Sequence, residues 1–191
     1  LERRDDALRP GQALLDRHPE ARLSVSKTTR PRGPREVEGY DFIFVSESEF
    51  KKQVEAGEFL EHVQIGDHFY GTPRTAIADN RKAGRDVILD VDTDGAQSVK
   101  KICPDAVLIF IAPSSSEALT ARLKSLDPGR PDLWPGRLAH AREDLARSTE
   151  YDYVVLSDSL VATAENLSAI LRAAITDTMS NAAKQTQNGT R

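Results

Sequence analysis

Cysteine is almost missing from this chain, which has only Cys103 among its 191 residues. A single thiol can form neither an intramolecular disulfide nor a cysteine metal cluster, which is typical of proteins from reducing compartments. No apolar run approaches the ~18 residues that span a bilayer, and the charged N-terminal stretch lacks the apolar core of a signal peptide. We therefore expect a soluble, cytoplasmic protein without a membrane partner.

An excess of charge of one sign is missing as well. Lysine and arginine number 26 against 30 acidic residues, for a net charge of -4. No basic surplus predicts a nucleic-acid partner, and no acidic tract predicts disorder. The chain shows no internal repeat, and its length suits one domain with a hydrophobic core, present as a monomer or a homodimer.

Apolar runs alternate with helical patterns, which predicts an α/β fold with a parallel sheet flanked by helices. The predicted strands span residues 22–26, 41–45, 58–65, 68–70, 86–91, 107–111 and 154–156. Those at 86–91 and 107–111 are apolar without alternation, so we expect them to be buried.

Capping signals predict where the helices begin and end. Ser46 and Glu49 form a capping box before a helix that stops at Gly57. Thr72 is expected to cap a helix with Pro73 in its first position. A last helix is expected over residues 160–175, followed by a flexible tail at 180–191.

Three polar clusters suit a nucleoside monophosphate. Arg30 lies in a Gly/Pro-rich loop after a strand, and arginine forks and phenol hydroxyls bind phosphate well. Glu61 stands in an apolar segment, and its carboxylate could accept the two N–H donors on one edge of guanine. Tyr70 and Thr72 flank Gly71, which would let the backbone approach a ligand closely.

The third cluster follows the apolar strand at 86–91. Asp90 and Asp92 lie at its carboxyl end, where open α/β sheets bind ligands and metals. Taken singly, each of these residues has an ordinary structural explanation as a strand-end cap, a turn or a solvated carboxylate. Their joint spacing carries the functional interpretation.

This spacing resembles that of the guanylate kinase family, whose members transfer phosphate from ATP to GMP. The resemblance covers about residues 13–171 and implies a P-loop-kinase-type sheet, a small β-rich subdomain for the nucleoside monophosphate, and a lid. It places the core at 1–30 and 84–179, the GMP-binding subdomain at 31–83 and the lid at 124–137.

The resemblance also implies residue roles. Arg30 and Tyr70 would hold the GMP phosphate, and three side chains would read the guanine: Ser26, Glu61 and Thr72. Asp92 would set the base and the metal environment, and Gly95 also matches the family. The implied catalytic residues are Arg30, Arg137 and Asp92, with Mg²⁺ entering together with ATP.

The sequence departs from the family where ATP should bind. A loop of the form G-x-x-x-x-G-K-[ST], whose backbone cradles phosphate, would fall on residues 1–8, which contain neither glycine nor lysine. The strand that precedes this loop in the family is absent from the sequence, and its loss would leave neighbouring strands without a partner.

Other departures are single residues. Gly33 stands where the family has a second phosphate-binding arginine, and Phe42 replaces a phosphate-binding tyrosine. In the lid, three residues are expected to break the family's helix: Pro131, Pro135 and Gly136. Ser157 replaces the asparagine on the adenine side.

The expected function is therefore that of a guanylate kinase, ATP-dependent phosphorylation of GMP to GDP, with GMP recognised and the ATP chemistry impaired. One alternative is a non-catalytic guanylate-kinase-like module that binds a phosphorylated peptide in the acceptor site. A related sugar-bisphosphate kinase is less expected, because it would not need the guanine-reading set.

Overall fold

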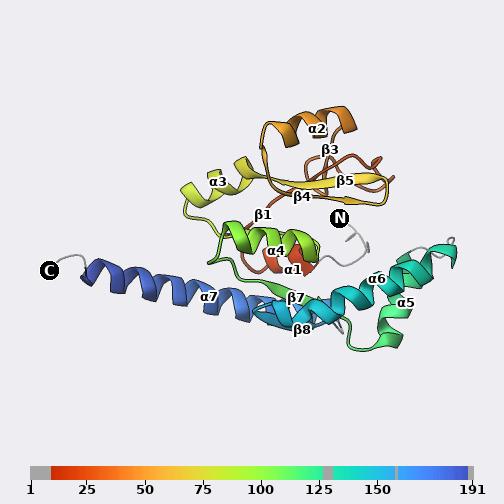
Figure 1. Ribbon diagram of the computed structural model, residues 1–191. Coiled ribbons are helices and arrows are strands. Elements are labelled where there is room, and N and C mark those ends of the chain that lie inside the picture. The colour runs from red at the N-terminus through yellow and green to blue at the C-terminus, as the bar shows by residue number, and fades with distance from the viewer. Residues whose placement is uncertain (1–9, 127–130, 158, 189–191) are drawn as a thin grey trace. The chain divides into compact units, whose positions relative to one another are not determined.

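A computed structural model describes residues 10–126, 131–157 and 159–188 of the chain (Figure 1). Its contacts divide it into two compact units, each described here by itself. Unit 1 comprises the described parts of Leu1–Arg17 and Val107–Arg191, and unit 2 is His18–Ala106. The division into core, GMP-binding subdomain and lid stays a prediction.

Unit 2 is built on a four-stranded sheet in the order β3-β2-β5-β4. Its strands are β2 (Lys27–Thr28), β3 (Ile43–Phe44), β4 (Phe59–Ile65) and β5 (His68–Pro73). β4 and β5 form an antiparallel hairpin whose turn contains Gly66 at a φ of 60°. Glycine adopts this left-handed conformation without steric cost, so the two strands predicted from the sequence pair directly.

Three helices accompany this sheet, namely α2 (Glu47–Glu55), α3 (Arg74–Lys82) and α4 (Thr93–Ile102). The predicted cap of α2 is confirmed, because the Ser46 hydroxyl accepts a hydrogen bond from the backbone N–H of Glu49 at 3.2 Å. Gly57 follows the end of this helix at a φ of 68°, as its stop signal indicated.

The predicted cap of α3 is wrong. Thr72 lies inside β5, and the N-cap of α3 is Pro73, which has no side chain to donate or accept. The Thr72 hydroxyl instead donates to Glu61 on the neighbouring strand β4. A hydrogen bond to the neighbouring strand has replaced the predicted capping hydrogen bond at the start of α3.

Phenylalanine rings form the hydrophobic core of unit 2. Phe50 on α2 is fully buried and stacks on Phe59, with 4.5 Å between the ring centroids. Its other face lies toward Phe69, at 5.6 Å. Figure 1 shows how α2 covers the β4–β5 hairpin from one side. This stack fixes the helix to the sheet.

The remaining strands form two parallel pairs, one in each unit. β1 (Arg22–Leu23) pairs with β6 (Val87–Ile88) in unit 2, and β7 (Ile109–Ala112) pairs with β8 (Tyr153–Leu156) in unit 1. Each sheet contains two strands within the described ranges.

The prediction of deeply buried core strands is only partly right. β6 is half-buried over both of its residues. In the β7–β8 pair Ala112 and Val155 are buried, but Ile111 is 36% and Val154 50% exposed. A strand with one neighbour in a two-stranded sheet lacks the layer that would cover its apolar side chains.

Unit 1 contains α1 (Pro10–Leu15), α5 (Ser116–Leu126), η1 (Pro131–Leu133), α6 (Trp134–Ala146), η2 (Arg147–Glu150) and α7 (Leu160–Asn188). α7 reaches Asn188, so the tail predicted from residue 180 is helical as far as that residue. The segment contains no glycine or proline before Gly189 and is rich in good helix formers. None of the helices in the described ranges combines the length and hydropathy that a bilayer span requires.

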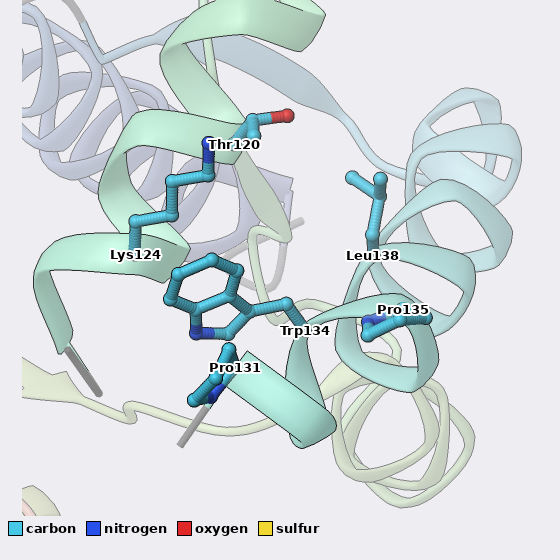
Figure 2. A pocket seen from close by; sticks show the side chains of 6 residues that line it. All are labelled: Thr120, Lys124, Pro131, Trp134, Pro135 and Leu138. Atoms are coloured by element: carbon cyan, nitrogen blue, oxygen red, sulfur yellow. The ribbon is translucent and has the colours of Figure 1, made fainter. Parts of the chain in front are cut away.

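The lid prediction is also corrected. α6 begins at Trp134, so Pro135 and Gly136 lie in its first turn rather than breaking it. The first N–H groups of a helix have no intrahelical acceptor, so proline costs little there. α5 and α6 enclose a hollow of about 270 Å³. Figure 2 shows the Trp134 ring in this hollow, where Lys124 Nζ lies 5.5 Å from the ring centroid.

Replacing Phe50 with alanine should destabilise unit 2 strongly. The substitution removes a fully buried ring between two aromatic neighbours, and Phe→Ala changes in cores cost about 3–5 kcal/mol. Urea denaturation gives the free energy of unfolding. Ile65→Ala, at a position that is 50% exposed, is the control and should cost under about 1 kcal/mol. Equal losses in both variants would contradict the assigned core.

Candidate functional site

Glu61 and Thr72 face each other across the β4–β5 hairpin. They are direct partners in the antiparallel register, and the Thr72 hydroxyl donates to Glu61 Oε1. Glu61 is 8% exposed and Thr72 1%. A carboxylate this deeply buried is rare without a fixed partner, and here the hydroxyl fixes its orientation.

Ser26 directly precedes β2, the neighbour of β5 in the sheet. β2 pairs antiparallel with β5, matching Lys27 with Gly71 and Thr28 with Tyr70. Continued by one residue beyond β2, this register would set Ser26 opposite Thr72. Of the three residues predicted to read guanine, Thr72 on β5 and Glu61 on β4 are paired in the sheet.

Asp92 joins the Glu61–Thr72 pair from the start of α4. It is the N-cap of this helix, and its Oδ1 accepts a hydrogen bond from the Gly95 N–H at 2.7 Å. A Cβ at Gly95 would lie 3.0 Å from Asp92 Oδ1 and 3.0 Å from Glu61 Oε2. The missing side chain thus lets two carboxylates approach the same point on the helix.

Burial raises the pKa of Glu61 above its ordinary value. The hydrogen bond from Thr72 opposes this shift, and the negative charge of Asp92 adds to it. Two carboxylates therefore lie beside Gly95, and their oxygens are acceptors that suit N–H donors such as those on the edge of guanine.

Arg30 and Tyr70 meet at the other end of the same sheet. The guanidinium donates to both oxygens of Glu36, at 2.8 and 2.7 Å, and to the Pro31 carbonyl at 3.0 Å. The Glu36 carboxylate raises the pKa of Arg30 above its usual range, with a smaller contribution from a hydrogen bond to Tyr70.

Phe42 lies against this arginine instead of offering a hydroxyl. The Arg30 Cζ atom is 5.3 Å from the centroid of the Phe42 ring and 5.9 Å from that of Phe44. The Phe42 ring also meets Tyr70 edge to face at 6.0 Å. The tyrosine-to-phenylalanine departure keeps a cation–π contact and removes one possible phosphate donor.

The expected role of Gly71 needs a correction. A Cβ at this position would lie 2.7 Å from a ring carbon of Phe59 and 3.1 Å from one of Phe50. The space that glycine leaves open is therefore filled by the aromatic core, and Gly71 serves packing rather than the close approach of a ligand.

Asp90 is exposed after β6. Arg137 is exposed on α6, which belongs to unit 1, and its role stays a prediction. The loop expected at residues 1–8 lies outside the described residues. Within the described ranges no three His, Cys, Asp or Glu side chains gather as a metal cluster.

Glu36 and Gly95 are the two contributors that sequence reasoning did not assign. Glu36 could have been found as an opposite charge six residues from Arg30 across a Gly/Pro-rich loop. Gly95 was noted only as a family match. No sequence pattern shows that its missing Cβ accommodates Glu61, which lies 34 residues earlier in the chain.

An α/β chain with a buried carboxylate–hydroxyl pair and an arginine–tyrosine pair on one small sheet is typical of the acceptor half of a nucleoside monophosphate kinase. The guanylate kinase family model matches residues 9–174. The chain is 41% identical over 172 residues to the guanylate kinase of Symbiobacterium thermophilum, covering 90% of this chain and 82% of that one. It is 40% identical to the enzyme of Maricaulis maris, covering 84% and 74%.

The fold gives the same result. The crystal structure of guanylate kinase from Anaplasma phagocytophilum superposes with a TM-score of 0.71 at 33% identity, covering 85% of this chain and 80% of that one. The chain belongs to the guanylate kinase family.

The raised pKa of Glu61 predicts a pH-dependent stability difference between the wild type and Glu61→Gln. A carboxyl whose pKa is higher in the folded state stabilises the fold below its unfolded value and loses that contribution as pH rises. The wild type should therefore lose stability relative to the variant as pH rises from about 4.3, the ordinary pKa of glutamate in an unfolded chain, upward. Urea denaturation of both proteins across this range measures it, and a constant difference would contradict it.

Gly95→Ala should disturb the carboxylate pair without unfolding the helix. The added methyl group, at 3.0 Å from both oxygens, must displace Glu61 or Asp92. We expect guanine-nucleotide affinity to fall by about tenfold or more, since each charged hydrogen bond contributes about 1.5–3 kcal/mol. Calorimetric titration with GMP measures this. Ala96→Gly, one residue along the same helix, controls for helix propensity and should leave the affinity within about twofold.

Proposed function

We propose that this chain binds GMP on the four-stranded sheet of unit 2 and serves as the acceptor half of a guanylate kinase. Guanine presents two N–H donors on one edge, and the Glu61 carboxylate accepts both. Ser26 and Thr72 complete the row beside it, and Asp92 supplies the second carboxylate. The phosphate lies toward Arg30 and Tyr70.

The buried Glu61–Thr72 pair is the observation that supports this proposal most strongly. An ionised carboxylate at 8% exposure is costly, and its raised pKa measures that cost. Hydrophobic packing of unit 2 does not by itself require a buried carboxylate at position 61. Thr72 donates to Oε1 and leaves Oε2 of Glu61 to other partners. A ligand with two N–H donors would hydrogen-bond to this carboxylate and so offset the free-energy cost of burying its charge.

The reaction is transfer of the terminal phosphoryl group of ATP to a phosphate oxygen of GMP, which yields GDP and ADP. Mg²⁺ arrives bound to the ATP phosphates and neutralises their charge. Arg30 neutralises the acceptor phosphate, Asp92 holds the base end of the site, and Arg137 of α6 is the proposed partner of the transferred group.

The donor side limits this activity. The 191-residue sequence contains no G-x-x-x-x-G-K-[ST] segment, the pattern whose backbone and lysine hold the β- and γ-phosphates. We propose that the protein of this sequence recognises GMP but transfers phosphate too slowly for turnover to be measured.

Calorimetric titration with GMP and then with ATP-Mg²⁺, followed by a coupled assay for ADP, tests both parts. We expect micromolar or weaker binding of GMP and no ADP formation. Glu61→Gln should weaken GMP binding by about 10–100-fold, because a charged acceptor contributes about 1.5–3 kcal/mol. Glu55→Gln, an exposed position on α2 with the same change of charge, is the control.

GMP-dependent ADP formation would contradict the proposed loss of turnover. Binding of a phosphorylated peptide without GMP binding would contradict the nucleotide site and support an interaction module instead.

A further inference from the structure

The predicted phosphate ligand Arg30 is already engaged by a carboxylate of its own chain. Glu36 accepts from both terminal nitrogens of the guanidinium, at 2.8 and 2.7 Å, in the two-pronged geometry that arginine also offers to phosphate. A third N–H is directed to the Pro31 carbonyl at 3.0 Å. Both side chains are largely covered, at 29% and 20% exposure.

Gly33 holds this carboxylate in place. Its backbone N–H donates to Glu36 Oε2 at 2.7 Å. A Cβ at Gly33 would lie 3.0 Å from the same oxygen and 3.4 Å from Glu36 Cδ. A side chain at this position would crowd that oxygen, and the carboxylate would have to move by a few tenths of an ångström. The glycine that stands in place of the family's arginine thus favours the seating of Glu36 on Arg30.

A carboxylate and a phosphate compete for the same donors. Each offers two oxygens at a spacing that matches one face of the guanidinium, and both are anions. A phosphate that approaches Arg30 would meet the negative charge of Glu36 and find the terminal nitrogens engaged.

We propose that Glu36 is a built-in anion that occupies the phosphate seat of Arg30 and must be displaced before a ligand phosphate can bind. This inference rests on the proposed GMP site and assigns a specificity residue within it. It follows that the site discriminates strongly on the guanine and weakly on the phosphate, so that guanosine and GMP bind with similar affinity.

Inorganic phosphate is the probe that isolates this seat from the guanine end. Its dissociation constant follows from the rise in the thermal unfolding midpoint on titration at constant ionic strength. Glu36→Gln keeps the shape and removes the charge, and it should bind phosphate about five- to tenfold more tightly than the wild type. Gly33→Ala should act in the same direction to a smaller extent, because the added methyl group pushes the carboxylate away from its seat.

Two further variants separate this effect from net charge. Glu38→Gln makes the same charge change in the same loop, but the Glu38 side chain accepts from the Phe44 backbone at 3.2 Å, so phosphate affinity should stay at the wild-type level. In the double variant Arg30→Gln/Glu36→Gln, the gain should disappear. Equal or weaker phosphate binding by Glu36→Gln, or an equal gain in Glu38→Gln, overturns the proposal.

GMP and guanosine titrations distinguish this failure from failure of the proposed function. In the wild type the two affinities should lie within about tenfold of each other, and in Glu36→Gln the preference for GMP should widen by the factor measured with phosphate. A wider preference already present in the wild type overturns the proposal. If neither guanine ligand binds any variant while phosphate behaves as expected, the GMP site is wrong and the assignment of Glu36 as the internal anion stands.

Discussion

The hydrogen bond from Thr72 to Glu61 depends on the pairing of β4 with β5, and most of the candidate site depends on it in turn. Because strand side chains alternate between the two faces of a sheet, a shift of one residue would turn Glu61 away from Thr72. The same register sets Gly71 under the Phe50 and Phe59 rings. One pairing therefore fixes the aromatic core on one face and the polar row on the other.

The β4–β5 register holds the aromatic core and the polar row in a fixed relation to each other. Unit 2 therefore has a defined geometry around Glu61, although apolar side chains of the parallel strand β8 in unit 1 are half exposed. Unit 2 has its own four-stranded sheet and its own aromatic core. In the parallel pair of unit 1, Val154 and Leu156 on β8 are half exposed. The family model matches residues 9–174 and so includes parts of both units.

Short-range sequence signals predicted the helices and strands better than they predicted the tertiary contacts of those elements. The Ser46 cap, the Gly57 stop and the β4–β5 hairpin follow from short-range chemistry, and the structure contains all three. The cap at Thr72 was wrong because a cross-strand carboxylate took its hydroxyl. The helix break at Pro135 was wrong because that residue lies in a first turn, where proline costs little. Such outcomes depend on where an element begins, which sequence patterns locate only within a few residues.

The site shows the same limit. Ser26, Glu61, Tyr70 and Thr72 were predicted from the family resemblance. The structure places Glu61, Tyr70 and Thr72 in paired strands and Ser26 just before β2, and their roles stay predictions. The residues whose effect sequence reasoning missed act either through an absent side chain, as the glycines do, or through the residue that they contact, as Glu36 does. Gly95 matters because it has no Cβ between two carboxylates, and Gly33 because it has none beside Glu36. Neither effect is visible before the chain is folded.

Glu61 on β4 and Glu36 in the loop before β3 show how one residue type serves opposite purposes in unit 2. Glu61 is buried with a hydroxyl partner, and burial raises its pKa, so it gains from donors that a ligand brings. Glu36 is already paired with a guanidinium and a backbone N–H, so it loses those partners when a ligand anion arrives. In the proposed GMP site, the base end would therefore contribute favourable free energy on binding, while the phosphate end would exchange one anion for another. Recognition of the base would then determine which ligand is retained, and Arg30 would orient the phosphate only after Glu36 has moved aside.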